Sequence, residues 1–152
     1  MTATTPLPAV ELPRNTFTNA ALTYTYGAKT PYVFGGFNPA TGLDCSGLVG
    51  NVLAVDFGII LPGLTGPWTP AVGWHPPDAA SYLTWKSAWT VPRNSAWSGD
   101  LAVWTTHIGI CLSGSYMLSA LNQADGLVVT PISGYGPAGE KLVIRRITQA
   151  LF

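Results

Sequence analysis

The spacing of hydrophobic positions divides the chain into a helical first part and a strand-rich second part. Residues 1–14 are rich in Thr and Pro and show no regular apolar spacing, so we expect a flexible N-terminal arm. From residue 15 to about residue 26 the apolar spacing is helical, and Gly27 stands where a helix would end. Apolar residues at positions 48, 49, 52, 53 and 55 predict a second, buried helix that begins near Cys45, with Asp44 as its N-cap.

The remaining segments predict turns, loops and strands. Residues 31–34 have an extended pattern, and residues 38–42 have turn composition. Residues 58–92 are rich in Gly, Pro and Trp, which predicts a long loop with a short helix near residues 78–85. Strands are expected at residues 101–104, 107–112, 116–121, 127–129 and 142–147. Helices followed by antiparallel strands indicate an α+β fold, in one domain spanning residues 15–152.

The composition narrows the classes of partner. Of the 152 residues, 47% are hydrophobic and only 9% are charged, and the formal net charge is zero. A nucleic-acid partner would need clustered positive charge, so none is expected. The longest apolar runs are too short and interrupted to span a bilayer, so we expect no membrane partner. Residues 1–15 do not have the pattern of a secretory signal, which predicts that the protein reaches its substrate by another route.

The candidate chemistry centres on Cys45, in the run Asp44-Cys45-Ser46-Gly47. A thiol at a helix start lies among free backbone N–H groups, which lower its pKa and can also hold an oxyanion. A cysteine nucleophile needs a base, and the chain has two histidines. His107 begins an apolar strand and is therefore held rigidly, whereas His75 lies in a loop. We therefore predict His107 as the base.

Four sequence blocks in this order resemble the NlpC/P60 family of cell-wall peptidases. They are residues 31–36, 42–49, 99–101 and 107–110. The resemblance implies a papain-like fold, in which N-terminal helices, including the nucleophile helix, pack on a C-terminal antiparallel sheet. It places the family cysteine at Cys45 and the histidine at His107. The family residues that shape the substrate pocket correspond to Tyr32, Asp44 and Ser46.

The third catalytic position departs from the family pattern. The family usually has His, Asn or Gln on the strand after the hairpin, where it orients the histidine. An ungapped match from His107 places Ser119 there. Asn122 and Gln123, a few residues further on, remain alternatives.

The resemblance implies hydrolysis of peptidoglycan stem peptides, often at the bond between D-glutamate and the diamino acid. The implied mechanism is that of a thiol protease, with no cofactor and no metal. The alternatives are an N-acetylmuramoyl-L-alanine amidase or another Cys-His acyl hydrolase, and a non-catalytic wall-binding or phage tail domain. Residues 119–120 and 134–139 also resemble phage versions of the family. This predicts an endolysin or tail-associated protein acting at the cell wall, as a monomer or as part of a larger phage protein.

Structural roles are expected for the other notable side chains. Cys111 lies in mid-strand between apolar residues, so we expect it in the core. Trp68 and Trp74 could form a wall of the substrate groove. Arg145 and Arg146 have the pattern of a solvated strand end, and Asp100 that of a turn residue. No His or Cys pair has the close spacing of a zinc site.

Overall fold

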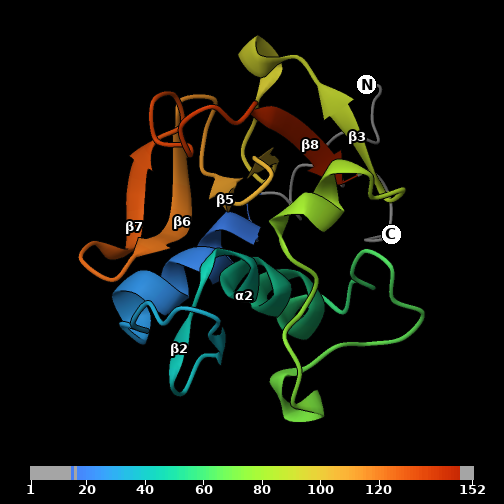
Figure 1. The fold of residues 1–152 in the computed structure, drawn as a ribbon, viewed down its shortest axis with the longest axis vertical. Helices are drawn as coiled ribbons and strands as arrows, with labels where there is room; N and C mark the ends of the chain where they lie inside the picture. The colour runs from blue at the N-terminus through green and yellow to red at the C-terminus, as the bar shows by residue number, and fades with distance from the viewer. Residues whose placement is uncertain (1–14, 16, 148–152) are drawn as a thin grey trace, which may run out of the picture.

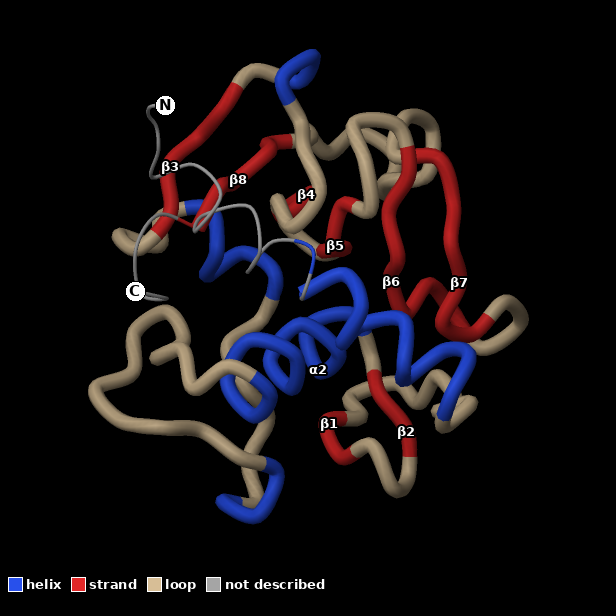
Figure 2. The backbone as a smooth tube through the Cα atoms, turned by 180° about the vertical axis from the view of Figure 1, so that it is seen from behind, coloured by secondary structure: helices blue, strands red, loops and turns tan. Residues whose placement is uncertain are grey.

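A computed structural model describes residue 15 and residues 17–147, which form an α+β fold. Helical segments come first and an antiparallel sheet follows. In Figure 1 helix α2 lies at the centre, with strands of the sheet above it and the small hairpin that carries β2 below it. Figure 2 shows the same arrangement from behind, with the β6–β7 pair on one side of the sheet and β3 and β8 on the other.

The helical elements are short and joined by loops. Residues 17–22 are α-helical and continue into the π-helical segment η1. The helical elements with bounds are η1 (Thr23–Gly27), α2 (Cys45–Gly50), the π-helical η2 (Asn51–Asp56), and the 3₁₀ segments η3 (Pro70–Val72), η4 (Ala79–Leu83) and η5 (Arg93–Ser95). Helix α2 passes directly into η2, so the predicted nucleophile helix is confirmed over residues 45–56.

Two sheets complete the fold. The strands are β1 (Phe37–Asn38), β2 (Gly42–Leu43), β3 (Ala88–Val91), β4 (Leu101–Val103), β5 (Ile108–Cys111), β6 (Tyr116–Asn122), β7 (Gly126–Pro131) and β8 (Val143–Ile147). Strands β1 and β2 form a small hairpin over the predicted turn. The other six form an antiparallel sheet in the order β3-β8-β4-β5-β6-β7, so the last strand lies inside the sheet.

The sheet has a different apolar cluster on each face. Helix α2 packs against β5 and β6, where Leu48 and Val49 are fully buried in one cluster with Ile108 and Leu118. Cys111 belongs to the second cluster and is fully buried, which confirms the expected core position. Alternating side chains therefore give the sheet two buried faces, and helix α2 is fixed against one of them.

Five of the six strands in the larger sheet of the described residues were expected, and the sixth was missed. Residues 88–91, expected to be loop, form the edge strand β3 and pair with β8.

The pair Arg145 and Arg146 was also wrongly placed at a solvated strand end. Arg145 is 7% exposed, and the carbonyls of Tyr82, Trp85 and Ala88 accept its guanidinium hydrogens. The arm expected for residues 1–14 lies outside the described residues, and the division at residue 15 stays a prediction.

Arg146 pairs with Asp100 instead of facing solvent. Its guanidinium lies 2.9 Å from the Asp100 carboxylate and 5.1 Å from the Trp97 ring centroid. Asp100 is 1% exposed and also accepts the Trp97 N–H, at 2.8 Å. Asp100 therefore closes the turn before β4 and also neutralises the guanidinium of Arg146. Its role extends beyond that of the turn residue expected from the sequence.

Candidate active site

Cys45 is the first residue of helix α2 and is partly exposed. Asp44 is the N-cap, because one carboxylate oxygen, Oδ1, accepts the backbone N–H of Gly47 at 2.7 Å. The Ser46 hydroxyl lies 3.5 Å from the same oxygen. The run Asp-Cys-Ser-Gly is thus a helix start in which the cap residue and the thiol are adjacent.

Gly47 allows the segment that carries Tyr32 to lie against this helix start. A Cβ on Gly47 would overlap the carbonyl oxygen of Gly36 and would stand 2.9 Å from Asp44 Oδ1. Tyr32 forms a bridge with Leu43, and the Asp44 N–H donates to the Gly36 carbonyl at 2.9 Å. The glycines therefore bring the residue 31–36 segment into contact with the start of α2.

Cys45 opens onto a cavity of about 270 Å³. Its walls come from the residue 31–36 segment, the start of α2, the long loop before β3, and the loop between β4 and β5. The lining residues are Tyr32, Phe34, Asp44, Cys45, Ser46, His75, Asp78, Ala79, Thr105 and Thr106. The cavity therefore contains all three residues expected to shape a substrate pocket, which are Tyr32, Asp44 and Ser46.

His107 follows Thr106, which lines this cavity, and directly precedes the first residue of β5. It is 6% exposed, and its Nε2 lies 3.1 Å from the hydroxyl of Ser119 on β6. The backbone N–H of the next residue, Ile108, lowers the pKa of the Cys45 thiol, so the sulfur faces the start of β5. Within the described residues, no hydrogen bond joins the Cys45 sulfur to either imidazole.

The loop that precedes His107 is fixed by Glu140. Its carboxylate accepts the backbone N–H of Thr106 at 2.8 Å and the Thr106 hydroxyl at 2.7 Å. Glu140 lies on the segment between β7 and β8, far from the loop in sequence. These two hydrogen bonds fix Thr106, which lines the cavity and directly precedes His107. No sequence signal pointed to them.

The two alternatives for the third position lie elsewhere. Asn122 is the last residue of β6, and its side-chain oxygen accepts the Asp125 N–H at 2.7 Å in the turn to β7. Gln123 is exposed in the same turn. Of the three candidates, Ser119 is the one whose side chain contacts His107.

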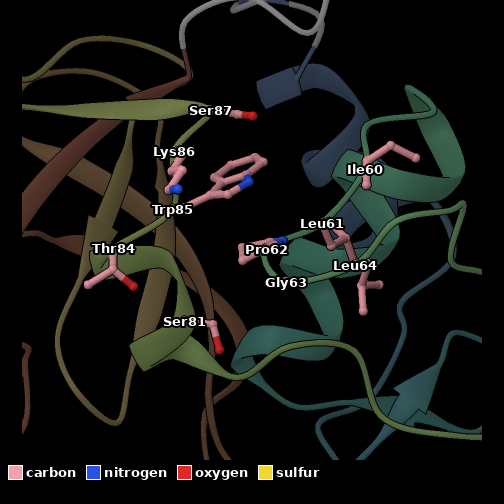
Figure 3. Close-up of a pocket in the computed structure, with 10 residues that line it drawn as sticks. All are labelled: Ile60, Leu61, Pro62, Gly63, Leu64, Ser81, Thr84, Trp85, Lys86 and Ser87. Atoms are coloured by element: carbon pink, nitrogen blue, oxygen red, sulfur yellow. The ribbon is translucent and has the colours of Figure 1, made fainter.

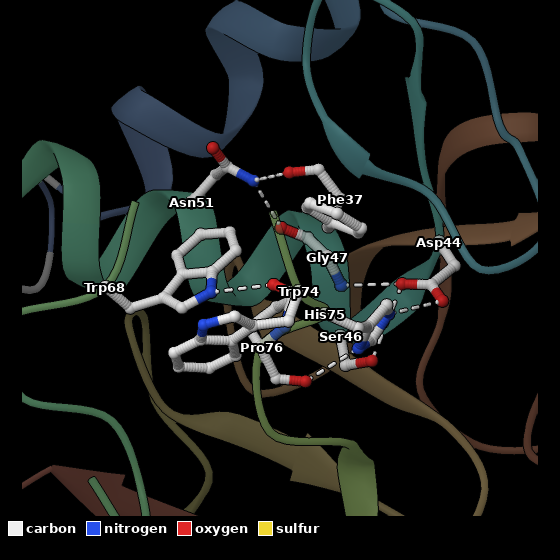
Figure 4. A network of polar contacts seen from close by, with 9 residues as sticks. All are labelled: Phe37, Asp44, Ser46, Gly47, Asn51, Trp68, Trp74, His75 and Pro76. Atoms are coloured by element: carbon white, nitrogen blue, oxygen red, sulfur yellow. Dashed lines mark hydrogen bonds and ion pairs between the residues drawn. The ribbon is translucent and has the colours of Figure 1, made fainter. Parts of the chain in front are cut away.

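His75 reaches the site, although the sequence placed it in a loop of uncertain position. Its Nε2 lies 2.8 Å from Asp44 Oδ2, and its Nδ1 lies 2.6 Å from the Pro76 carbonyl oxygen. Figure 4 shows this contact continuing into the capping bonds of α2, since Asp44 joins both. His75 lies beside Asp44 only because of the path of its loop in the folded chain, so the sequence alone did not predict this contact.

Burial and charge set the electrostatics of the site. Burial and the neighbouring Asp44 carboxylate raise the pKa of the Cys45 thiol to about 11, and the backbone N–H groups of Ile108, Ser46 and Cys45 act in the opposite direction. The expected lowering by the helix start is therefore present but outweighed. Burial lowers the pKa of His107, and Glu140 partly opposes this. The resting site therefore favours a neutral thiol and a neutral imidazole.

Trp68 and Trp74 differ in burial. Trp68 is fully buried, and its indole N–H donates to the Trp74 carbonyl at 3.1 Å, as Figure 4 shows. Trp74 is 48% exposed. Neither lines the Cys45 cavity, so a groove-wall role for Trp68 is wrong.

A second cavity, of about 530 Å³, lies between residues 60–64 and residues 81–87. Figure 3 shows Leu61 and Leu64 on one side of it, and Trp85 and Lys86 on the other. None of the candidate site residues lines it. Among the described residues, no helix is long and apolar enough to cross a membrane, and no group of three potential metal ligands is present.

Comparisons with known proteins agree with the geometry. The NlpC/P60 family model matches residues 29–146. The NlpC/p60 domain of the peptidoglycan hydrolase SagA is 24% identical over 86% of this chain and 97% of that chain, with a TM-score of 0.60. The peptidoglycan hydrolase RipB from Mycobacterium tuberculosis is 23% identical over 98% of this chain and 75% of that chain, with a TM-score of 0.57.

A third structure is the P60 domain of an antigen from M. avium subspecies paratuberculosis. It is 22% identical over 88% of this chain and 98% of that chain, with a TM-score of 0.56. At these identities the solved structures show a shared fold. No curated protein matches the chain in sequence. The family model covers most of the chain, including Cys45, His107 and Ser119, and the chain therefore belongs to the NlpC/P60 family.

Proposed function

We propose that this protein is a cysteine peptidase that hydrolyses peptide bonds in the stem peptides of bacterial peptidoglycan. The observation that carries the proposal is the position of Cys45. It starts a capped helix, opens onto a cavity and faces the strand that begins beside His107. The family membership and the fold shared with two peptidoglycan hydrolases support the substrate class.

His107 is the better base because of how the two imidazoles are bonded. Both ring nitrogens of His75 face acceptors, a carbonyl and a carboxylate, so His75 has no lone pair available for the thiol proton. The Nε2 of His107 bonds to Ser119, which leaves its Nδ1 to accept a proton. Catalytic hydrogen bonds in unliganded enzymes are often long and shorten when substrate binds.

The proposed reaction proceeds through an acyl-enzyme. The Cys45 thiol passes its proton to His107 as the sulfur attacks the peptide carbonyl carbon, and the backbone N–H of Cys45 stabilises the oxyanion. The imidazolium then protonates the leaving amine, and the C–N bond breaks. His107 next takes a proton from water, whose oxygen attacks the thioester carbonyl carbon. The C–S bond then breaks, and the imidazolium returns the proton to the Cys45 sulfur as the carboxylic acid leaves. Ser119 acts as the third member, which holds the His107 ring.

The finer assignment follows the family pattern. We place the cleaved bond between D-glutamate and the diamino acid, with Tyr32, Asp44 and Ser46 contacting the peptide. The resemblance of residues 134–139 to phage proteins supports delivery to the wall by a phage, as a lysin or a virion component.

Digestion of purified peptidoglycan tests this proposal. Wild-type protein is expected to release soluble peptides whose masses identify the bond, and Cys45→Ala and His107→Ala are expected to release none. Ser119→Ala should slow release by about tenfold or more, because the ring loses its orienting partner, whereas Asn122→Ala and Gln123→Ala should leave it unchanged. Circular dichroism checks that each variant folds.

Three results would contradict the proposal. Release by Cys45→Ala at the wild-type rate would remove the nucleophile. Fragments cut between sugar and peptide would indicate an amidase. No release by wild-type protein from several wall types would favour a non-catalytic wall-binding or tail domain.

A further inference from the structure

His75 is bonded in a way that requires a positive charge. Its Nδ1 lies 2.6 Å from the Pro76 carbonyl oxygen, and its Nε2 lies 2.8 Å from the Asp44 carboxylate. Both partners are acceptors, and a neutral imidazole has only one N–H to donate. The geometry is satisfied on both sides when His75 is an imidazolium. Consistent with this, the hydrogen bond from Asp44 raises the pKa of His75, while burial opposes the shift.

The loop that carries His75 is held against the nucleophile helix. The Trp68 indole donates to the Trp74 carbonyl at 3.1 Å, and a Cβ on Gly50 would stand 2.9 Å from Pro76. The Phe37 ring lies edge-on to the imidazole, with centroids 5.9 Å apart. The imidazole is therefore fixed beside the start of α2 by contacts on both neighbouring residues.

Asp44 divides its two oxygens between the helix and this imidazole. Oδ1 accepts the Gly47 N–H, and Oδ2 faces His75. The same carboxylate is adjacent to Cys45 and disfavours the thiolate. A cation on its outer oxygen offsets that charge and holds the cap in place.

The charged and titratable groups around His75 come from three elements. Asp44 and Cys45 lie at the start of α2, Tyr32 lies on the segment before it, and Asp78 lies on the loop of His75 itself. The β4–β5 loop contributes the uncharged hydroxyls of Thr105 and Thr106, with Glu140 bonded to the latter. His75 is thus the one cationic group among the residues described as lining this cavity.

We propose that His75 is a positioning residue of the active site, which as an imidazolium holds the Asp44 carboxylate and offsets its negative charge beside the Cys45 thiol. This inference rests on the proposed function, because it takes Cys45 as the nucleophile. It assigns a role to the histidine that does not exchange the catalytic proton. Loss of its charge should make the thiolate harder to form while leaving the helix cap intact.

Alkylation of Cys45 tests this without any peptidoglycan substrate. The rate of iodoacetamide labelling is measured between about pH 5.5 and 9, and the labelled peptide is identified by mass spectrometry so that Cys111 is counted separately. His75→Gln keeps a donor for Asp44 but removes the charge. We expect it to slow labelling at about pH 6 to 7 by about three- to tenfold, with the difference from wild type disappearing as pH rises through the pKa of His75 and the imidazole loses its charge. His75→Lys should restore most of the rate.

Two controls separate charge from structure. Lys86→Gln removes an equal charge from an exposed residue outside this cavity, and its profile should match wild type. In an Asp44→Asn background the cap remains but the carboxylate is gone, so His75→Gln should slow labelling at about pH 6 to 7 by less than about twofold.

Each outcome decides the matter. Equal labelling rates for wild type and His75→Gln at about pH 6 to 7, or an undiminished slowing in the Asp44→Asn background, would overturn the role of His75 while the proposed nucleophile stands. If Cys45→Ala releases peptides from peptidoglycan at the wild-type rate, the proposed function fails, and this inference fails with it.

Discussion

The two histidines of this chain differ because their partners differ. His107 faces a serine hydroxyl in a buried position, and His75 faces two acceptors, a carbonyl and a carboxylate. Burial therefore favours neutral His107, while the acceptors favour charged His75. The surroundings thus move the pKa values of the two histidines in opposite directions.

The acid limit of activity should reflect the lowered pKa of His107. The base must be neutral, so activity is present above the folded-state pKa of His107 and lost as pH falls through it. Because burial places this pKa below the ordinary value of 6.5, the acid limb of kcat/KM should have its midpoint below about 6.5. Rates on a soluble peptide measured against pH check this.

Circular dichroism at each pH is the control, because a histidine with a lowered pKa also destabilises the fold as it becomes protonated in acid. An acid midpoint well above 6.5, with the fold intact, would contradict the assignment of a neutral buried base.

Local sequence predicted the residues whose roles depend on near neighbours. Cys45 and Asp44 are adjacent, and their helix start was visible from the pattern of the following residues. His75 and Arg145 were misjudged because their partners lie 31 and up to 63 positions away. No local pattern encodes such contacts, so only the folded chain shows them.

At the scale of elements, the start of α2 depends on a close contact between backbones. Gly47 faces the Gly36 carbonyl so closely that no side chain fits. The motif glycine is therefore required by the segment packed on the helix, although an alanine would otherwise favour helix formation by up to about 1 kcal/mol.

Gly47→Ala should destabilise the protein by about 2–3 kcal/mol, because the methyl group forces the residue 31–36 segment away from α2. Urea unfolding measures the free energy, and Cys45 labelling should slow in the same variant as the cap distorts. Gly27→Ala is the matched control, since its Cβ would meet only Thr23 at 3.8 Å. Equal stability of the two variants would show that the segment moves at little cost.

Element prediction succeeded where periodicity was long and failed at β3. The five predicted strands have apolar runs bounded by turn residues. Strand β3 has four residues, two of them exposed, within a Gly-, Pro- and Trp-rich segment. It is defined by pairing with β8 and by Arg145, whose guanidinium contacts the Ala88 carbonyl and the Thr90 hydroxyl.

The change from α2 to the π-helical η2 was also not visible in the sequence. It occurs at Asn51, whose side chain donates to the Gly47 carbonyl at 2.8 Å.

For the whole molecule, the balance of charge is the notable property. Lys and Arg equal Asp and Glu in number, and charged residues make up 9% of the chain. Attraction to an anionic wall polymer by net charge is therefore not available to this protein. Under the proposed function, recognition of the wall therefore depends on short-range contacts at the site.

Activity on whole peptidoglycan should therefore depend little on salt. We expect the initial rate of release to change by less than about twofold between about 50 and 300 mM NaCl, because only long-range charge attraction is screened in this range. A steep fall in rate with salt would show that a local positive patch drives wall binding.

The position of β8 within the sheet has a consequence for how the protein is made. Residues 143–147 lie between β3 and β4, so the two parts of the sheet cannot join until the last strand has left the ribosome. The segment with Cys45, the proposed nucleophile, is synthesised about a hundred residues earlier. Until β8 is inserted, Arg145 cannot secure the carbonyls of the segment before β3. A chain interrupted during translation would thus carry Cys45 and His107 without the completed sheet.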